Sequence, residues 1–140
     1  MASANRRSGV VIVRPPAESM SRQKLPYFMG ISGDNSGATG ISMNLIIIPA
    51  GGAAEAHLHR GYETAIYILK GHVETRYGAG LGLTLTCQEG DFIFIAADVP
   101  HQPVNLSTTE PAMAIVARND PNEQESVVLY DPTAEARSTG

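Results

Sequence analysis

Apolar positions along the chain fall into short stretches, and each stretch is bounded by glycine, proline or aspartate. Several stretches alternate apolar with polar residues, which is the pattern of a half-buried β-strand. No segment shows a helical period of any length. The pattern predicts strands at residues 41–48, 53–59, 64–69, 72–77, 83–87, 92–95, from 104 onward, 112–117 and 127–130. Many short strands without long helices indicate an all-β barrel or sandwich.

The ends of the chain carry features of their own. We interpret Val10–Val13 as a further short strand, ended by two prolines. Residues 17–30 look irregular, and we expect Leu25–Phe28 to pack over one mouth of the barrel. Unpaired strand edges attract partner strands. The runs at 10–13 and 127–130 therefore predict pairing between two copies of the chain as a homodimer.

Composition and charge limit the classes of protein to consider. A chain of 140 residues forms one domain with a buried core. The net charge of −4 argues against non-specific binding of nucleic acid. Cys87 is the only cysteine, so there is no internal disulfide, which fits a reducing compartment. The apolar run near the N-terminus is too short for a signal peptide or a membrane span. We expect a cytoplasmic protein with no membrane partner.

The candidate chemistry lies in a short stretch with two histidines. His57 and His59 stand two residues apart, and in an extended strand such side chains point to the same face. Glu63 follows four residues later and reaches the same point across a short turn. A second stretch supplies a candidate fourth donor, His101. Imidazole and carboxylate donors suit one divalent transition metal ion, for which we consider Fe, Mn, Zn and Ni.

The first stretch resembles the first motif of the cupin family, G-x5-H-x-H-x(3,4)-E-x6-G. Gly51 is followed after five residues by His57, then by His59 and, three residues further, by Glu63. Gly71 closes the segment.

The second stretch resembles the second cupin motif, G-x5-P-x-G-x2-H-x3-N. Gly90, His101 and Asn105 fall in register with it. Ala96 stands where the motif has proline, and Asp98 stands where it has its second glycine. Aspartate tolerates a left-handed backbone better than most residues, so Asp98 is compatible with that turn. The resemblance narrows the fold to a double-stranded β-helix, or jelly roll.

The spacing of the first motif leaves the fourth ligand open. Glu63 fits the three-residue spacing, but Gly71 then comes one residue late. Counted with the four-residue spacing, the glutamate position falls on Thr64. If Ile66 and Ile68 fill the barrel interior, Thr64 shares their face and Glu63 needs a bulge or a turn to point inward. The alternatives are Glu63 as a ligand, or a three-histidine site with Thr64 beside the metal.

The resemblance also predicts the organisation of the chain and its pocket. We expect an N-terminal extension with a short edge strand and loops over 1–40, a cupin barrel over 41–118 with its motifs at 51–71 and 90–105, and a C-terminal strand and tail over 119–140. The candidate contacts for a substrate in the barrel are Thr64, Tyr67, Met43 and Phe94.

The function that the resemblance implies is metal-dependent. Cupin relatives include dioxygenases, sugar and keto-acid isomerases, polyketide cyclases, decarboxylases and non-catalytic binding domains, and the fold does not choose among them. Open coordination positions distinguish a catalytic metal site from a structural one. We expect an enzyme for a small oxygenated organic molecule, with dioxygenase-type oxidation preferred. The alternatives are an isomerase or cyclase that uses the metal as a Lewis acid, and a non-catalytic cupin that binds or senses a small ligand.

Overall fold

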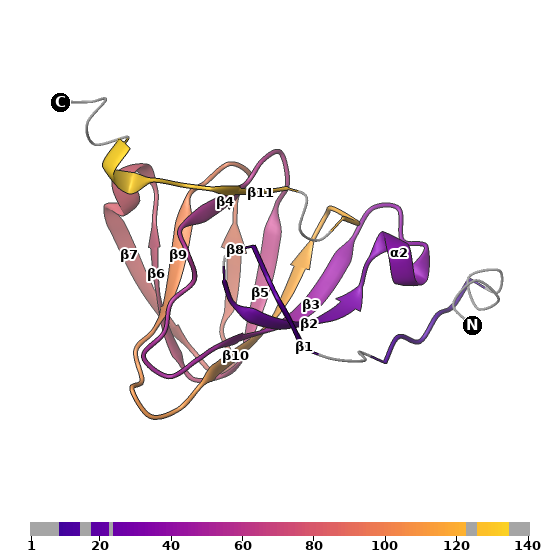
Figure 1. The fold of residues 1–140 in the computed structure, drawn as a ribbon, viewed down its shortest axis with the longest axis horizontal. Helices are drawn as coiled ribbons and strands as arrows, with labels where there is room; N and C mark the ends of the chain where they lie inside the picture. Colours follow the sequence, from indigo (N-terminus) through magenta and orange to yellow (C-terminus); the bar gives the residue numbers. More distant parts are fainter. Residues whose placement is uncertain (1–8, 15–17, 23, 123–125, 135–140) are drawn as a thin grey trace.

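The computed structural model describes residues 9–14, 18–22, 24–122 and 126–134. These residues form two layers of antiparallel strands (Figure 1). The strands are β1 (Glu18–Met20), β2 (Pro26–Ile31), β3 (Ser42–Ile48), β4 (His57–His59), β5 (Thr64–Lys70), β6 (His72–Tyr77), β7 (Leu83–Gln88), β8 (Phe92–Ile95), β9 (His101–Asn105), β10 (Ala112–Arg118) and β11 (Val127–Leu129).

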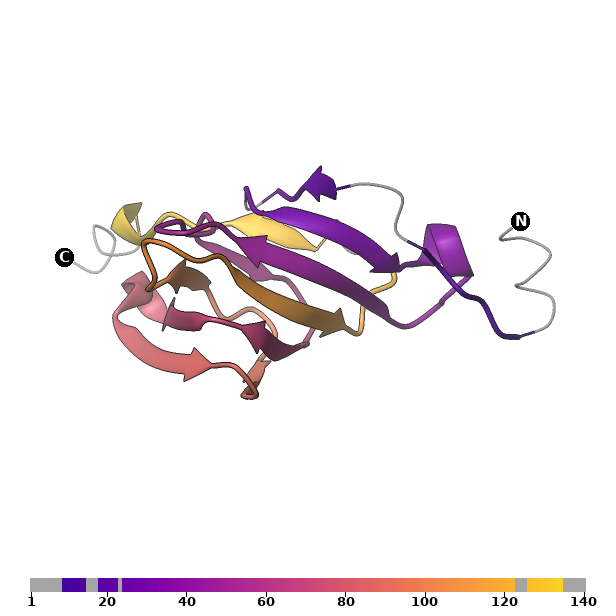
Figure 2. The same ribbon diagram turned by 90° about the horizontal axis from the view of Figure 1, so that it is seen from below.

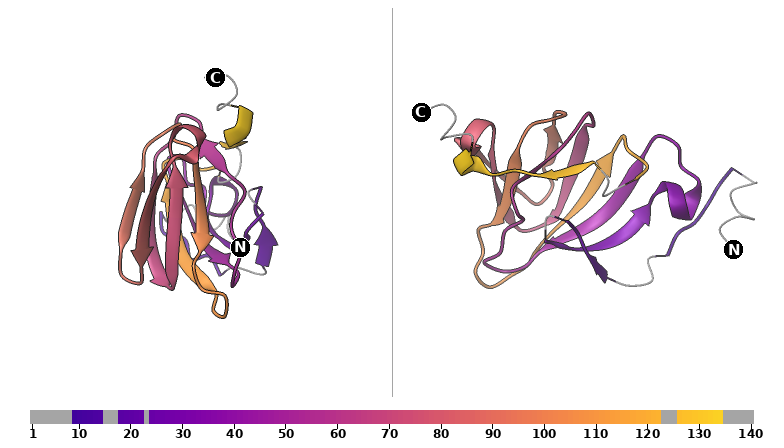
Figure 3. Two further views of the ribbon diagram at one scale, coloured as in Figure 1. Left: turned by 90° about the vertical axis from the view of Figure 1, so that its left-hand side faces the viewer. Right: turned by 45° about the horizontal axis from the view of Figure 1, so that its top comes forward.

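The strand order explains how distant motifs meet. One sheet has the order β1-β2-β3-β10-β5-β8 and the other the order β11-β4-β9-β6-β7. The two sheets face each other across the core (Figure 2 and Figure 3). Strand β4 carries the first histidine pair, and it lies beside β9, which begins at the third histidine. The prediction of an all-β jelly roll without long helices is confirmed.

Helical structure in the described residues is limited to single turns. Helix α2 (Gly33–Ser36) lies at one end of the molecule, and the 3-10 turn η1 (Ala79–Leu81) joins β6 to β7 at the other end (Figure 1). Among the described residues, no helix has the length and apolar character needed to cross a membrane.

Side-chain alternation divides each strand between the core and the outside. The buried core cluster combines both sheets and consists of Leu25, Ile48, Ala54, Ile68, Val73, Cys87, Ala112 and Ala114. Strand β10 supplies two of these residues because it pairs with β3 on one side and with β5 on the other. The prediction that the 112–117 run forms a strand is confirmed, and its even-numbered residues face the interior.

The N-terminal region differs from the prediction in two ways. The structure has no strand at Val10–Val13, so that prediction is wrong. One edge of the larger sheet is formed by β1 instead. The region expected to be irregular, 17–30, contains β1 and most of β2. Leu25 is almost fully buried. The C-terminal run does form an edge strand, β11, which pairs with β4.

Asn105 closes one end of the barrel. Its side chain is buried, and its Nδ2 group lies 2.8 to 3.2 Å from the carbonyl oxygens of Ile48, Pro49 and Glu110. Its Oδ1 atom accepts a hydrogen bond from the Ser107 amide. One amide side chain therefore ties the end of β3 to the turn that leads into β10.

Two residues in turns of the motifs, Asp98 and Gly71, have a left-handed backbone conformation. Asp98 has a φ of 66°, as expected for a residue that replaces a glycine in a left-handed turn. Its carboxylate accepts a hydrogen bond of 2.9 Å from the Gly61 amide, and its own amide donates to the His59 carbonyl. This substitution therefore adds a link between the two motifs. Gly71 has a φ of 100°, and a Cβ atom there would lie 2.9 Å from the Ala112 Cβ.

Candidate metal centre

Three histidine side chains meet between the sheets. His57 and His59 lie on the same face of β4, as their spacing predicts, and His101 is the register partner of His57 on β9. Each of the three is 3 to 4% exposed. Their ligand nitrogens all lie within 4.8 Å of one another. The sequence prediction that these three residues come together is therefore realised in the structure.

Hydrogen bonds to the backbone orient two of the rings. The Nδ1 atom of His57 lies 2.8 Å from the Glu55 carbonyl, and that of His101 lies 2.9 Å from the Val99 carbonyl. A carbonyl oxygen only accepts, so Nδ1 carries the proton in both rings and Nε2 keeps its lone pair. This tautomer is typical of metal-binding histidines, whose second nitrogen donates to a carbonyl or carboxylate.

The His59 ring is hydrogen-bonded to a side chain instead of the backbone, and its Nε2 atom is also available to a metal ion. Its Nδ1 atom lies 3.4 Å from the Ser126 hydroxyl. Its Nε2 atom is buried and has no hydrogen-bond partner among the described residues. A buried nitrogen without a partner is unfavourable by about 1–3 kcal/mol, and coordination of a metal ion would satisfy it.

Burial keeps the three rings neutral. Desolvation, with a contribution from the charge of His101, lowers the pKa of His57 from 6.5 to about 3. Desolvation lowers the pKa of His101 to about 4. Burial and the positive charge of Arg118 lower the pKa of His59 well below its ordinary range. Neutral imidazole is the form that binds metal, so protons do not compete for these ligands at neutral pH.

The three nitrogens fit a divalent transition metal ion. Two nitrogens bound to one ion at roughly 2.0–2.1 Å cannot lie more than about 4.2 Å apart. The ligand nitrogens lie within 4.8 Å of one another, so the rings would move closer together around an ion. His57, His59 and His101 would hold the ion, and three protein ligands leave coordination positions open.

Glu63 lies outside this cluster. Its side chain is exposed, so the structure does not support its prediction as a fourth ligand. The reason is strand alternation: Thr64 is the first residue of β5 and is 3% exposed, and its neighbour faces the opposite way. The pairing of β5 shows no register shift at Thr64, and hydrogen bonds with Asn119 hold the Glu63 backbone. Thr64, the residue of the alternative prediction, lines the same cavity as the three histidines.

A cavity of about 50 Å³ adjoins the histidines. Its wall contains Thr64, as predicted, and Arg118 at the end of β10. Arg118 is 6% exposed, and its Nε–H donates a hydrogen bond of 3.0 Å to the Thr64 hydroxyl. Burial lowers the pKa of Arg118 to about 10, while Asp120 opposes this shift, so the guanidinium stays charged at neutral pH.

Three predicted pocket residues lie on the wrong side of the larger sheet. Met43 is 45% exposed and Phe94 is 64% exposed, and neither lines the cavity. The Tyr67 ring packs on the Phe92 ring with centroids 4.8 Å apart, and it does not line the cavity either. They lie outside this cavity because alternation turns each of these side chains outward while its strand neighbours point inward.

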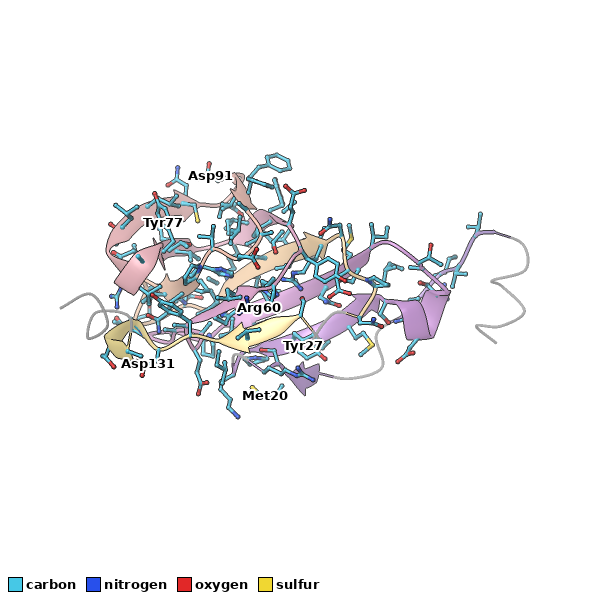
Figure 4. All side chains as sticks on the ribbon, turned by 90° about the horizontal axis from the view of Figure 1, so that it is seen from above. Met20, Tyr27, Arg60, Tyr77, Asp91 and Asp131 are labelled. Atoms are coloured by element: carbon cyan, nitrogen blue, oxygen red, sulfur yellow. The ribbon has the colours of Figure 1, made fainter. Side chains whose placement is uncertain are left out.

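The residues that do line the cavity come from eight strands and one loop. Sequence reasoning missed most of them, including Arg118, which shares a face with Ala114 and Val116 and was identifiable from that alternation. Tyr27 of β2, labelled in Figure 4, lines the cavity together with Leu25, in line with the expected packing of this segment over the barrel. The cavity is lined by Leu25, Tyr27, Asn44, Ile46, His57, His59, Thr64, Ile66, Thr75, Ile95, His101, Pro103, Val116 and Arg118.

Comparison with known proteins gives one family and several similar folds. The family model of the cupin domain matches residues 44–118, which is more than half of the chain. No curated protein matches the sequence. Among solved structures, the oxalate decarboxylase of Lactobacillus farciminis, in complex with formate, is similar with a TM-score of 0.68 and 22% identity. The alignment covers 81% of this chain and 33% of that one, so the chain spans about a third of the decarboxylase.

Two further structures are similar over most of their length. The polyketide cyclase RemF of Streptomyces resistomycificus has a TM-score of 0.63 and 23% identity, with 85% of this chain and 77% of that one covered. A conserved protein with a double-stranded β-helix domain from Klebsiella pneumoniae has a TM-score of 0.63 and 16% identity, with 85% and 90% covered. At these identities the similarity shows a shared fold.

Proposed function

The chain belongs to the cupin domain family, and we propose that it is a metal-dependent enzyme that acts on a small oxygenated organic molecule inside the barrel. The observation that supports this most strongly is the three-histidine cluster, in which two rings are held by backbone carbonyls and the third has a buried Nε2 atom without a partner. A cavity beside the cluster offers room for a substrate.

Different residues would bind the metal ion, orient the substrate and exclude water. A divalent Fe, Mn, Zn or Ni ion would supply Lewis-acid or redox chemistry at this site. His57, His59 and His101 would hold the ion. Thr64 and Arg118 lie in the cavity wall and would orient a polar substrate group. The remaining wall is largely apolar and would exclude water, which strengthens electrostatic interactions in the site.

The reaction class has two candidates. The ligand set expected from the sequence, three histidines and one carboxylate, favoured dioxygenase-type oxidation. With Glu63 outside the cluster, that argument no longer separates oxidation from Lewis-acid chemistry. A donor set of three neutral imidazoles leaves the full charge of the ion available to polarise a carbonyl. We therefore propose metal-dependent isomerisation or cyclisation as an equal candidate.

Turnover measurements separate these candidates. Protein loaded with each of Fe(II), Mn(II), Zn(II) and Ni(II) is incubated with small keto acids, diketones and enols while oxygen consumption and product masses are recorded. Product formed with oxygen consumption supports oxidation, and product formed without it supports isomerisation or cyclisation. His101→Ala should abolish turnover, and His72→Ala, which changes an exposed histidine, should not. Tight ligand binding without any product would contradict an enzyme and favour a binding or sensing cupin.

A homodimer is also part of this proposal, and the outer face of the larger sheet supports it. Contiguous apolar side chains of β3, β5, β8 and β10 point away from the core there. Phe92 is 83% exposed and Phe94 is 64% exposed. Continuous exposed apolar faces are typical of protein interfaces. In a twofold dimer the same patch of both copies meets, and an apolar face can pack in this way against a second copy.

Light scattering tests the dimer. Wild-type protein at micromolar concentration should have the mass of two chains. The double variant Phe92→Asp, Phe94→Asp should have the mass of one chain, while Leu83→Asp, on the other sheet and 58% exposed, should stay dimeric. A wild-type monomer would contradict this part of the proposal. A cytoplasmic location and the absence of nucleic-acid partners remain predictions from the sequence.

A further inference from the structure

Asn44 places a side-chain amide in the wall of the histidine cavity. It belongs to β3, on the sheet opposite the histidine strands, and it lies outside both motifs. Its side chain is 5% exposed and lines the cavity. Buried polar groups are nearly always hydrogen-bonded, so both ends of this amide need a partner in the protein or in the cavity.

A β-bulge in the neighbouring strand fixes the orientation of this amide. Met29 of β2 pairs with Asn44, and the next pair joins Ile31 to Met43. Gly30 is therefore an extra residue without a partner in the ladder. Its N–H donates a hydrogen bond of 3.1 Å to the Oδ1 atom of Asn44. A backbone N–H only donates, so the oxygen of the amide faces the bulge and the nitrogen is the opposite end.

The bulge depends on glycine. A Cβ atom at Gly30 would collide with the Met43 carbonyl oxygen. The Gly30 carbonyl accepts a hydrogen bond of 2.6 Å from the Nδ2 group of Asn35, so side-chain amides satisfy both backbone groups of the bulged residue. Bulges are common beside functional sites, where they redirect a side chain. This bulge holds Asn44 by its oxygen and leaves its nitrogen free for another partner.

The Nδ2 group of Asn44 has no hydrogen-bond partner among the described residues. It carries two N–H donors and accepts nothing. The Thr75 hydroxyl, on β6 of the facing sheet, is 6% exposed, lines the same cavity and has no partner in the described part of the chain either. Two buried polar groups of this kind in one cavity indicate that a ligand or water molecule completes their hydrogen bonds.

An apolar chamber of about 30 Å³ adjoins the histidine cavity. The two share the lining residues Ile46, Ile66, Thr75 and Pro103. The other lining residues of the chamber are all apolar: Ile48, Ile68, Val73, Ile93, Ala112, Met113 and Ala114. Ile46 follows Asn44 on the inward face of β3, so the wall leads from the amide into the chamber.

The sizes of the two spaces limit the ligand. A water-sized group needs roughly 10–15 Å³ of such volume. Volumes of about 50 and about 30 Å³ therefore hold a molecule of roughly five to eight non-hydrogen atoms.

We propose that Asn44 recognises the oxygen of a small carbonyl compound, with its Nδ2 group donating to the carbonyl oxygen and the hydrocarbon part of the ligand in the apolar chamber. A group that only donates needs an acceptor, and a carbonyl oxygen is an acceptor without a proton of its own. This inference rests on the proposed function for the use of the cavity as a substrate site. It does not depend on a bound metal, because the amide and the chamber belong to the protein chain alone.

The test measures binding of cyclopentanone and cyclopentanol. The two molecules have the same number of non-hydrogen atoms, within the range that the cavity and chamber hold, but the ketone oxygen only accepts whereas the alcohol also donates. Each is titrated into isotope-labelled protein, first metal-free and then zinc-loaded, while proton–nitrogen correlation spectra are recorded. After assignment, the side-chain NH2 signals of Asn44 should shift on addition of cyclopentanone in both forms of the protein. Those of the exposed Asn119 should stay in place.

Variants separate recognition of the ligand from support of the bulge. Asn44→Asp keeps an oxygen for the Gly30 amide but replaces the NH2 donor with an acceptor. It should weaken cyclopentanone binding at least about 3-fold, which is the effect of one neutral hydrogen bond, and retain cyclopentanol, whose hydroxyl donates to a carboxylate. Asn119→Asp is the matched control, because Asn119 likewise accepts from a backbone amide, that of Glu63, but at the surface. It should change neither affinity.

A second variant covers the case in which Asn44→Asp does not fold. Asn44→Leu has a similar shape and removes the donor, so it should weaken binding of both ligands at least about 3-fold. Circular dichroism checks that each variant is folded.

The outcomes separate this inference from the proposed function. Unmoved Asn44 side-chain signals during the cyclopentanone titration, or an unchanged ratio of the two affinities in folded Asn44→Asp protein, would overturn the inference. If metal-free protein binds the ketone through Asn44 but no metal binds, the inference stands and the metal-dependent function fails. If metal binds and turnover is observed but the Asn44 signals do not respond, the reverse holds.

Discussion

The burial of three neutral histidines predicts a steep loss of stability in acid for metal-free protein. The pKa of His57 is about 3 and that of His101 about 4 in the folded chain, against 6.5 for an exposed histidine, and burial lowers the pKa of His59 further still. The unfolded chain therefore binds more protons below pH 6.5. By linkage, the free energy of unfolding falls as pH falls through this range, and it is unaffected by these groups well above pH 6.5.

The magnitude follows from the two pKa values of each group. A histidine that protonates at pH 6.5 when unfolded and stays neutral when folded destabilises the protein by about 2 kcal/mol between pH 7 and pH 5. Three such groups give at most about 6 kcal/mol. Small domains have a total stability of roughly 5–15 kcal/mol, so this effect is large enough to unfold the metal-free protein in mild acid.

Urea unfolding of chelator-treated protein at pH 7 and pH 5 measures this effect. The control is a variant in which His57, His59 and His101 are all replaced by glutamine, because it keeps the carboxylates that also titrate in acid. Wild-type protein should lose about 4–6 kcal/mol more than this variant between the two pH values. An equal loss in both proteins would refute the claim that the cluster is buried in its neutral form.

Three further predictions concern residues outside the cluster. Asn105→Ala should lower the free energy of unfolding by about 2–4 kcal/mol, because the buried Ile48 carbonyl and the part-buried Glu110 carbonyl lose their donor; a loss below about 0.5 kcal/mol would contradict this. Gly71→Ala should cost about 1–3 kcal/mol in the same urea assay, since it combines positive φ with a contact to Ala112; an unchanged midpoint would be the contrary result. The buried Cys87 thiol, whose pKa is raised by desolvation, should react with an aromatic disulfide reagent only after unfolding, and fast labelling of native protein would show otherwise.

Much of the fold was predictable from the sequence because its determinants are local. Strand alternation and turn residues indicate the barrel strands, and the i, i+2 spacing places His57 and His59 on one face. Asp98 takes the left-handed conformation expected of a glycine replacement. The strand β1 was missed because it has only three residues, and β2 was missed because it contains Pro26 and Gly30 and shows little alternation. Their position depends on pairing with β3, which is a tertiary contact.

The pocket was harder to predict than the metal ligands. Tyr67, Met43 and Phe94 are large apolar residues near the motifs, but size does not tell which face of a strand a residue occupies. The strand register decides which side chains point into the barrel. Thr64 and Ile66 lie on the inward face of their strand, so the inward residues could have been counted from Thr64. Arg118 lies 17 residues beyond His101 in the sequence, and only the pairing of β10 with β5 brings it to the histidines.

The most direct test of the account is the metal content of purified protein after reconstitution and removal of free metal. Elemental analysis is performed on wild-type protein, on His57→Ala and on His72→Ala, all purified without an affinity tag. We expect about one divalent metal ion per chain in wild-type protein and in His72→Ala, and its loss in folded His57→Ala. Iron or manganese would direct substrate screening to oxidation, and zinc or nickel to isomerisation and cyclisation. Wild-type protein that retains no metal, or a His57→Ala protein that retains as much, would contradict the central claim.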